Sequence, residues 1–459
     1  MGNDIRIEIP DKAKNIIQTI MDAGFEAYVV GGCVRDCILG RKPEDWDITT
    51  SAKPEQVKAL FPHTVDTGLQ HGTVTVMMGR EGFEVTTYRI DGKYEDSRHP
   101  KNVTFTPSLR EDLRRRDLTI NAMAYNDSQG LVDIFGGMED IRAGIVRCVG
   151  EPGERFREDA LRILRAVRFS AQLGYDIEER TKEAIVRLAP SLSRISAERI
   201  RTELVKLIVS PHPDYLRQAY ACGVTKVFLP EFDKAMETEQ NHPHHCYSVG
   251  EHILHSLCYV EADKILRLTM LFHDIGKPEV LTVDGDGLTH FHGHGAVSAR
   301  MAEEIMKRLR FDNDTIHMVC RLVLYHDYGN SLEPDKAMVR RAVSRIGQDA
   351  FPGLLEIKRA DILAQSDYLR DEKLACLERW RQLYQEIQEE GQCVALKDLA
   401  VTGRDLMGIG WKPGRELGAA LKKLLELVLE EPERNTKERL LEEAARYKKE
   451  LQETEQTNL

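Results

Sequence analysis

Two acidic residues near the amino terminus, Asp45 and Asp47, have the spacing of a metal-binding pair. They stand two apart in DWDITT, a segment expected to be extended, so both side chains project from one face, about 7 Å apart. Carboxylate oxygens suit Mg²⁺, and two such ions about 4 Å apart clamp the attacking and leaving oxygens of a phosphoryl displacement. Glu84, on a neighbouring predicted strand, is the best candidate for a third carboxylate. We therefore predict a catalytic site for two Mg²⁺ ions.

A glycine pair precedes these acids in the sequence. Gly31 and Gly32 end the strand-like run EAYVV, and a short helix is expected to follow. Backbone N–H groups at the start of that helix could hold a triphosphate, and Arg35 lies within the same turn. An Asp-x-Asp pair or a Gly-Gly pair alone is common in ordinary turns, so only their combination predicts nucleotide chemistry.

A second group of chemically capable residues lies in the middle of the chain. His273 and Asp274 are adjacent in LRLTMLFHDIGKP, and their side chains diverge by about 100° on a helix. They can serve one metal, or bridge two, only when other helices converge on them. The further candidate ligands are His252, His294, His326 and Asp361. Most histidines in helices are ordinary polar residues and not metal ligands. We interpret the remaining histidines of this region in that way: His242, His244, His245, His255, His290, His292 and His317.

The composition is that of an ordinary globular protein. The chain has 459 residues, 42% of them hydrophobic and 30% charged, which is enough for two to four domains. No run approaches the roughly 20 apolar residues of a membrane span, and the first residues lack signal-peptide features, so a cytoplasmic location without a membrane partner is expected. Nine scattered cysteines without a CxxC pair indicate neither disulfides nor a thiolate zinc site. The net charge of −11 does not exclude nucleic acid, because phosphate contacts depend on local arginines.

The elements that would position these residues change character along the chain. Strand and helix signals alternate over residues 1–150, whereas from about residue 155 apolar residues recur three and four apart, which predicts helices. The expected fold class is α+β: a mixed-sheet head (1–150), then all-α regions at 151–230, 231–375 and 376–459.

The segment GGCVRDCILGRKPEDWDITTS resembles the head of CCA-adding tRNA nucleotidyltransferases of the bacterial class II type and of bacterial poly(A) polymerases, which share their palm with DNA polymerase beta. DLRRRDLTINAMAYN is similar to the second family motif, which implies that Arg115, Arg116 and Asp117 contact the ribose and phosphates of the nucleotide. DIFGGMEDI resembles the hinge between head and neck. The resemblance covers residues 25–210 with motif order intact, and its implied partners are tRNA, CTP and ATP.

A third segment, EDALRILRAVRF, resembles the family's nucleotide-reading motif. Cytosine and adenine both present an amino donor beside a ring-nitrogen acceptor, whereas uracil and guanine present the reverse. Asp159 could accept from the amino group while Arg162, one helical turn later on the same face, donates to the ring nitrogen. Arg165 follows on this helix. The alternative is that Glu158, Asp159, Arg162 and Arg165 form solvated ion pairs worth a few tenths of a kcal/mol each.

The third nucleotide added must be A after two additions of C, so the base-reading residues need an adjustable segment beside them. The segment IDGKYEDSRHPKNVTFTPSL, residues 90–109, has the length and position of the flexible loop that complete CCA-adding enzymes use, and CC-adding enzymes are shortened there. The resemblance thus implies complete CCA addition, with an A-adding enzyme or a poly(A) polymerase as the alternative.

The histidine group resembles the HD-domain metal-dependent phosphohydrolases, which occur beside such heads. This implies a divalent metal of unknown identity and hydrolysis of a phosphate ester such as a 2′,3′-cyclic end. The helices over 376–459 are implied to grip the tRNA elbow. Two further alternative functions are a phosphohydrolase in which the head is only a binding module, and a non-catalytic RNA-binding protein. The second is disfavoured because clustered acids repel RNA unless metal intervenes.

Overall fold

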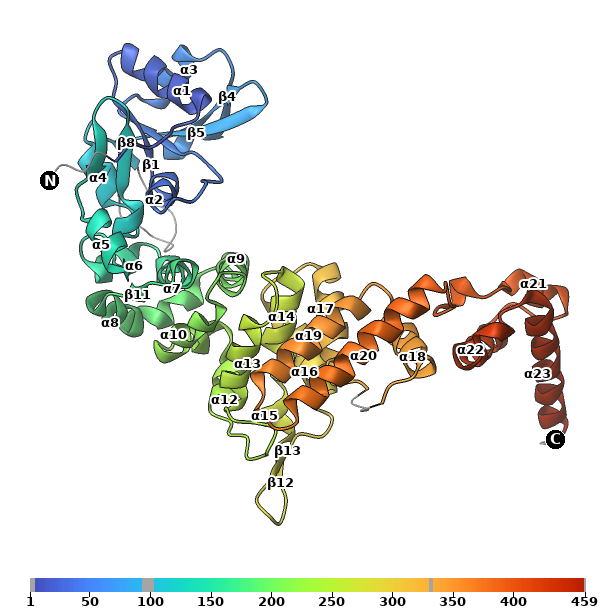
Figure 1. Ribbon diagram of the computed structural model, residues 1–459. Helices are drawn as coiled ribbons and strands as arrows, with labels where there is room; N and C mark the ends of the chain where they lie inside the picture. Colours follow the sequence, from blue (N-terminus) through green and yellow to red (C-terminus); the bar gives the residue numbers. More distant parts are fainter. Residues whose placement is uncertain (1–4, 93–102, 330–332, 458–459) are drawn as a thin grey trace. The chain divides into compact units, whose positions relative to one another are not determined.

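The computed structural model describes residues 5–92, 103–329 and 333–457 (Figure 1). The chain divides into two compact units: Met1–Asp233 with Arg308–Arg310, and Lys234–Lys307 with Phe311–Leu459. The first begins with a mixed sheet and the second is almost entirely helical, which confirms the α+β fold class. No helix in the described part of the chain is long and apolar enough to cross a bilayer. The four-domain division and the cytoplasmic location stay predictions.

A seven-stranded sheet forms the centre of the head. Its spatial order is β3 (Thr64–Gly68), β4 (Thr73–Met78), β5 (Glu81–Thr87), β2 (Ile48–Thr50), β1 (Ala27–Val30), β8 (Met123–Asn126) and β9 (Gly130–Asp133). Only β2 and β5 run parallel, with Ile48 opposite Val85. Asp47, directly before β2, is therefore level with Glu84 inside β5.

Helices cover the sheet because their apolar residues fall on one side. In α1 (Asp11–Asp22), Ala13, Ile16, Ile17 and Ile20 are buried at helical spacing. This helix packs against α3 (Pro54–Leu60) beside the strands (Figure 1). The head also holds α2 (Gly32–Ile38), α4 (Leu109–Arg114) and α5 (Gly137–Ala143). Tyr28, Tyr88 and Leu113 are among the fully or nearly fully buried residues of its core.

Two short strands overlap the predicted flexible loop. β6 (Arg89–Asp91) pairs antiparallel with β7 (Val103–Phe105). Both strands lie within the loop predicted at 90–109 or at its start, so part of that segment is a hairpin base. Residues 93–102, the middle of the predicted loop, lie outside the described residues.

The rest of the first unit is helical. Its helices are α6 (Pro152–Glu158), α7 (Leu161–Leu173), α8 (Glu179–Leu188), α9 (Ala197–Ile208), α10 (Leu216–Ala221), α11 (Thr225–Phe228) and the start of α12 (Pro230–Met236). One exception to the predicted all-helical region is the two-residue strand β11 (Asp176–Ile177), which pairs in parallel with β10 (Ile145–Val146) of the predicted head.

The predicted single helix over EDALRILRAVRF is wrong, because the chain turns between α6 and α7. Asp159 has an extended backbone, and its carboxylate accepts from the Leu161 N–H at 3.0 Å. An aspartate that bonds its own backbone two residues on competes with helix formation. Asp159 and Arg162 therefore do not lie on one face of one helix.

The second unit is built on helices that converge on its centre. They are α13 (Val249–Cys258), α14 (Lys264–Phe272), α15 (Lys277–Val280), α16 (His294–Arg308), α17 (Asn313–Tyr325), α18 (Lys336–Ile346), α19 (Phe351–Ala364) and α20 (Arg370–Glu389). Within this group α14 packs against α13, α17 and α19. A hairpin of β12 (Thr282–Val283) and β13 (Thr289–His290) follows α15.

The C-terminal helices have a core of their own. They are α21 (Gly403–Gly408), α22 (Arg415–Glu430) and α23 (Lys437–Thr457). Leu406, Trp411, Val428 and Leu440 are buried together there. Arg340 of α18 donates to the carbonyl oxygens of Leu429 and Glu430 at the end of α22, which ties this core to the preceding helices.

Candidate nucleotidyl-transfer site and metal centre

The three carboxylates predicted for catalysis lie close enough together, beside the start of β2, for their charges to interact. Asp47 directly precedes β2, and the Val30 N–H donates to its backbone oxygen at 3.0 Å. The strand begins only at Ile48, so Asp45 and Asp47 of the predicted extended segment lie before the strand and not within it. Partial loss of solvent raises the pKa of Glu84, and the charges of Asp47 and Asp45 raise it further. Partial loss of solvent also raises the pKa of Asp47, with Arg116 opposing the shift and Asp45 adding to it.

These mutually repelling charges fit a divalent cation, which would neutralise them. Within the part of the chain that the structure describes, their oxygens do not form a group of three all within 4.8 Å of one another. The arrangement is therefore too open for one ion held by all three side chains, and it leaves room for phosphate oxygens as further ligands.

Arg116 lies between the carboxylates and the glycine turn. Gly31 has a φ of 85°, and a Cβ there would lie 2.9 Å from Nη1 of Arg116, so both the backbone and the close approach require glycine. Nε of Arg116 is buried without a hydrogen-bond partner among the described residues. An unsatisfied donor beside a carboxylate cluster is a feature expected of a site that receives an anionic ligand.

All three predicted phosphate-binding arginines have partners within the protein, and Nη2 of Arg116 lies 3.8 Å from Oδ2 of Asp112. Arg35 donates to Asn121 Oδ1 at 2.6 Å and to Asp36 Oδ1 at 2.9 Å. Arg115 makes two bonds to Asp112 Oδ1, at 3.0 and 2.8 Å. Burial would raise the pKa of Asp112, but Arg115 and Arg116 lower it overall. Gly32, Arg35 and Arg115 thus remain predicted nucleotide contacts.

Sequence reasoning missed Asp112 and Asn121, although both belong to the quoted motif DLRRRDLTIN. Asp112 is fully buried and anchors Arg115, while Asn121 anchors Arg35. The available signal was an aspartate two residues before a run of three arginines, because a carboxylate that becomes buried requires a charged partner.

Asp117 is joined to Arg165 of α7. Arg165 contacts Asp117 Oδ2 at 2.6 Å through Nη2 and at 2.7 Å through Nε, and the Leu118 N–H donates to Oδ1 at 2.9 Å. Burial would raise the pKa of Asp117, but Arg165 holds it well below its usual value. The guanidinium of Arg165 also lies 5.5 Å from the ring centre of Phe169. This pair connects the second motif to the nucleotide-reading motif.

We expect Asp117→Asn to reduce the free energy of unfolding by about 2 kcal/mol at pH 7, because it leaves Arg165 without its charged partner. The carboxylate has a lower pKa in the folded state, so its contribution is present above about pH 4 and is lost as the pH falls further. Urea unfolding of the variant and the parent should therefore converge toward acid pH. Asp66→Asn, at an exposed ion pair with Lys58, is the control and should change stability by less than about 0.5 kcal/mol. An equal loss at pH 7 and pH 3 would contradict the assignment.

The two predicted base-reading residues have different partners. Asp159 accepts from Arg199 Nη2 at 2.7 Å, and Arg162 donates to Glu158 Oε2 at 2.7 Å. Arg162 also donates to the backbone oxygen of Arg115 at 3.1 Å. The ion pairs weighed as the alternative therefore exist in part, but they are half-buried and tie the reading motif to the second motif. Arg199, in α9, had no signal in the sequence beyond its charge.

The six predicted ligands of the second site converge from five helices. His252 lies on α13, His273 and Asp274 follow α14, and His294 begins α16. His326 follows α17 and Asp361 lies on α19. Asp274 is fully buried between two sets of donor atoms, each within 4.8 Å.

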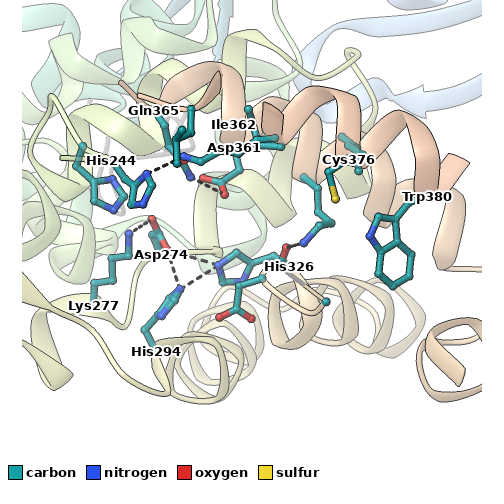
Figure 2. Close-up of a pocket in the computed structure, with 17 residues that line it drawn as sticks. His244, Asp274, Lys277, His294, His326, Asp361, Ile362, Gln365, Cys376 and Trp380 are labelled. Atoms are coloured by element: carbon teal, nitrogen blue, oxygen red, sulfur yellow. Dashed lines mark hydrogen bonds and ion pairs between the residues drawn. The ribbon is translucent and has the colours of Figure 1, made fainter. Parts of the chain in front are cut away.

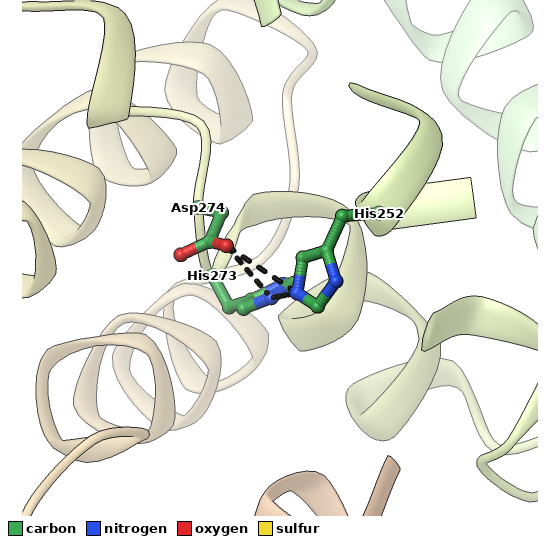
Figure 3. A group of neighbouring side chains, drawn as sticks. All are labelled: His252, His273 and Asp274. Carbon is green, nitrogen blue, oxygen red and sulfur yellow. Dashed lines mark hydrogen bonds and ion pairs between the residues drawn. The ribbon is translucent and has the colours of Figure 1, made fainter. Parts of the chain in front are cut away.

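Oδ2 of Asp274 faces the first set (Figure 3). It lies 3.4 Å from Nε2 of His252 and 3.3 Å from Nε2 of His273, and these two nitrogens are 3.2 Å apart. Asp361 Oδ1 lies 2.9 Å from Nε2 of His252 and 3.7 Å from Nε2 of His273.

Oδ1 of Asp274 faces the second set (Figure 2). It lies 3.3 Å from Nε2 of His294 and 3.6 Å from Nε2 of His326, and those nitrogens are 3.0 Å apart. This oxygen is buried without a hydrogen-bond partner that satisfies normal geometry, in the described part of the chain. One carboxylate thus bridges two donor sets.

Backbone carbonyls fix the orientation of these histidines. Nδ1 of His273, His294 and His326 lies 2.7–2.9 Å from the carbonyl oxygen three residues earlier, and Nδ1 of His252 lies 3.3 Å from Ala364 O. A carbonyl only accepts, so each Nδ1 carries the proton and each Nε2 presents its lone pair to the centre. Facing lone pairs about 3 Å apart need a cation between them.

A proton or a metal ion could supply that charge. Burial would lower the pKa of His273, but Asp274 and Asp361 raise it to about 10. A proton therefore sits on this pair when no metal is bound, and a metal must displace it. The set of four imidazoles and two carboxylates fits a first-row transition metal better than Mg²⁺.

Comparisons with known proteins agree with this organisation. Residues 27–147 match the family described as "Poly A polymerase head domain", and residues 291–444 match a tRNA nucleotidyltransferase domain 2 family. The CCA-adding enzyme of Lactobacillus helveticus is 37% identical over 429 residues, covering 92% of this chain and 94% of that enzyme. The head sheet, its carboxylates and the matched head domain define a nucleotidyltransferase.

Solved structures extend the comparison to the whole chain. The Bacillus stearothermophilus CCA-adding enzyme in complex with CTP has a TM-score of 0.72 and 29% identity, covering 98% of this chain and 99% of that one. The Thermotoga maritima CCA-adding enzyme complexed with tRNA has the same fold, with a TM-score of 0.58 and 22% identity over 97% of each chain. The chain belongs to the CCA-adding enzyme family. It is a nucleotidyltransferase that adds CCA to the 3′ end of tRNA.

Proposed function

We propose that the head adds C, C and A in turn from CTP and ATP, releases pyrophosphate, and holds two Mg²⁺ ions with Asp45, Asp47 and Glu84. The observation that carries this is the cluster of mutually repelling carboxylates beside Arg116, whose Nε is buried and has no hydrogen-bond partner in the described ranges of the chain. The solved relatives with CTP, ATP and tRNA support the same three partners for this chain.

The residues of the head have distinct roles in the proposed reaction. Bound Mg²⁺ would lower the pKa of the tRNA 3′-hydroxyl and neutralise the triphosphate. Arg116 approaches the glycine turn at Gly31, where we place the triphosphate. Asp112 holds Arg115 and Arg165 holds Asp117, so the second motif is positioned before the nucleotide arrives. Catalysis then consists of positioning and charge stabilisation.

We infer that Asp159 and Arg162 select the base even though they lie on separate elements. A carboxylate can accept about four hydrogen bonds, and Asp159 receives its bonds from Arg199 and the Leu161 N–H, so capacity remains for an exocyclic amino group. Arg162 is held beside the second motif by Glu158 and by the Arg115 carbonyl. These bonds fix the two side chains in place, which is what discrimination by hydrogen bonding requires.

Replacing both residues by alanine should relax base choice. We expect the preference for CTP over UTP, measured as a ratio of kcat/KM values, to fall about 10- to 100-fold, since each lost pairing is worth about 1–3 kcal/mol. Arg187→Ala removes an exposed arginine of α8 and should leave the ratio unchanged. Unaltered selectivity against UTP in the Asp159→Ala, Arg162→Ala variant would refute the assignment.

Complete CCA addition is tested with tRNA transcripts that end at the discriminator base, at C and at CC, each given CTP or ATP alone. We expect CTP to extend the first two and ATP to extend only the third, after which synthesis stops. An A-adding enzyme would extend only the CC transcript. A poly(A) polymerase would add runs of A to unrelated RNA.

The metal centre of the second unit favours a second candidate function. We propose that its two donor sets bind divalent cations, which would activate water against a phosphate ester such as a 2′,3′-cyclic end. The supporting observation is the facing Nε2 pairs bridged by Asp274. Lys277, Lys358 and Lys373 line the same cavity and could hold the phosphate. The role of residues 376–459 in gripping tRNA stays a prediction.

A further inference from the structure

Three arginines surround the aromatic ring of Phe169, a buried residue of α7. The guanidinium carbon of Arg168 lies 3.8 Å from the ring centre, that of Arg35 4.9 Å and that of Arg165 5.5 Å. A cation within about 6 Å of a ring centre is attracted by the electrons of the ring face. One phenylalanine is therefore close enough to attract three positive charges.

These arginines connect two elements that are far apart in the sequence. Arg35 lies on α2, which begins at the glycine turn of the head, whereas Arg165 and Arg168 lie on α7. A Cβ atom on Gly32 would lie 3.7 Å from Nη2 of Arg35, so this guanidinium group reaches back to the turn. The ring of Phe169 thus connects the glycine turn to the nucleotide-reading motif.

A carboxylate neutralises each of the three guanidinium groups. The partners come from separate parts of the first unit: Asp36 on α2 for Arg35, Asp117 of the second motif for Arg165, and Glu203 on α9 for Arg168. These pairs reduce the repulsion among three like charges around one ring. Hydrogen bonds to a carboxylate lie in the plane of a guanidinium group, so they leave its flat face available to an aromatic ring.

Two of these guanidinium groups belong to the proposed nucleotide site. Arg35 is a predicted contact of the triphosphate, and Arg165 holds Asp117, a predicted contact of the ribose and phosphates. A ring that fixes both guanidinium groups keeps these two contacts in place before the nucleotide arrives. Nucleotide binding then does not have to order them, which favours a low KM.

We propose that Phe169 is a positioning residue whose ring face orients Arg35 and Arg165, and so aligns the glycine turn with the second motif for nucleotide binding. This inference rests on the proposed roles of Arg35 and Asp117 at the nucleotide. The alternative is that the ring only fills space among the apolar stems of the arginines. The two roles differ because orientation depends on the electrons of the ring face, whereas filling depends on volume alone.

The test replaces Phe169 in the full chain by mono-, di- and trifluorophenylalanine, which withdraw electrons from the ring face stepwise while its shape changes little. We expect the KM values for CTP and for ATP to rise together, by about tenfold over the series, since both nucleotides carry the same ribose and triphosphate. Addition of C to a transcript ending at the discriminator base and of A to one ending at CC gives these values. The KM for tRNA and the preference for CTP over UTP should stay within a factor of about two.

Phe169→Leu and a second phenylalanine provide the comparisons. Phe169→Leu keeps an apolar side chain but loses the ring, so it should raise both KM values about as much as trifluorophenylalanine. The same fluorinated series at Phe156, a fully buried residue of α6, is the matched control and should leave every KM unchanged. Constant KM values along the Phe169 series would refute the role of the ring. An equal rise in the KM for tRNA would show that the substitutions act on the fold, which would also overturn the proposal.

Arg35→Ala separates this inference from the proposed function. It removes the predicted triphosphate contact and should raise the KM for CTP by about tenfold or more, and the fluorinated series should then have a smaller effect. If Arg35→Ala leaves the KM for CTP unchanged, the proposed triphosphate contact fails. If Arg35→Ala raises this KM while the fluorinated series does not, the contact is supported and the positioning role of Phe169 is refuted.

Discussion

Asp47→Ala should lower kcat for nucleotide addition by about 10³-fold or more, equivalent to roughly 4 kcal/mol of transition-state stabilisation. Asp47 stands directly before β2 with Asp45 and Glu84 around it, and its loss removes a proposed ligand from the charge cluster that the triphosphate must approach. Binding of tRNA should change little, because the side chain contributes to the reaction centre. Single-turnover addition of C to a transcript ending at the discriminator base, with tRNA affinity measured separately, gives both numbers.

Glu44→Gln is the matched control for this prediction. It removes an exposed carboxylate from the same segment, three residues before Asp47, and should leave the rate within a factor of about two. Full activity in Asp47→Ala would contradict the proposed site. A loss of tRNA binding that equals the loss of rate would show that the residue acts in folding or recognition instead.

Asp274→Asn should abolish metal binding at the centre of the second unit and leave CCA addition unchanged. The residue supplies one oxygen to each donor set, so its replacement disrupts both at once. Asparagine keeps an acceptor for Lys277, which lies 2.7 Å from Asp274 and would otherwise be buried without its partner. Any hydrolysis of a 2′,3′-cyclic phosphate should fall about 10³-fold, and both bound ions should be lost.

Two further substitutions sharpen this test. His294→Ala disrupts only the set formed with His326, so we expect one ion to be lost and one retained. Asp327→Ala removes an exposed carboxylate that lines the same cavity outside both donor sets, and it should alter neither metal content nor hydrolysis. Unchanged metal content in Asp274→Asn would contradict the proposed bridging role.

Much of the head could be predicted from local patterns. Alternation in GTVTVMM and GFEVTTYRI predicted β4 and β5, and the helical spacing of Ile16, Ile17 and Ile20 predicted α1, because both patterns report burial against a single neighbouring layer. The break at Asp159 could not be read in this way. A short polar side chain that bonds its own backbone overrides helical periodicity. The spacing of apolar residues that predicts a helix here is the same whether or not that bond forms.

The candidate sites show the same contrast between residues that local patterns reveal and residues that they do not. The six proposed metal ligands were selected by residue type, and the structure brings their side chains together, while their binding of metal stays a prediction. The partners that hold the other functional side chains were missed: Arg199 lies 40 residues from Asp159, and Asn121 lies 86 residues from Arg35. Such pairs depend on how helices and strands pack, which periodicity in one segment does not determine.

The most direct test of the central claim is a crystal structure of the protein with a non-hydrolysable CTP analogue and Mn²⁺, examined by anomalous scattering. We expect two ions within coordination distance of Asp45 and Asp47, at least one of which also contacts the triphosphate, with the base near Asp159 and Arg162. A triphosphate bound away from these carboxylates, with no ion on either aspartate, would contradict the proposed mechanism.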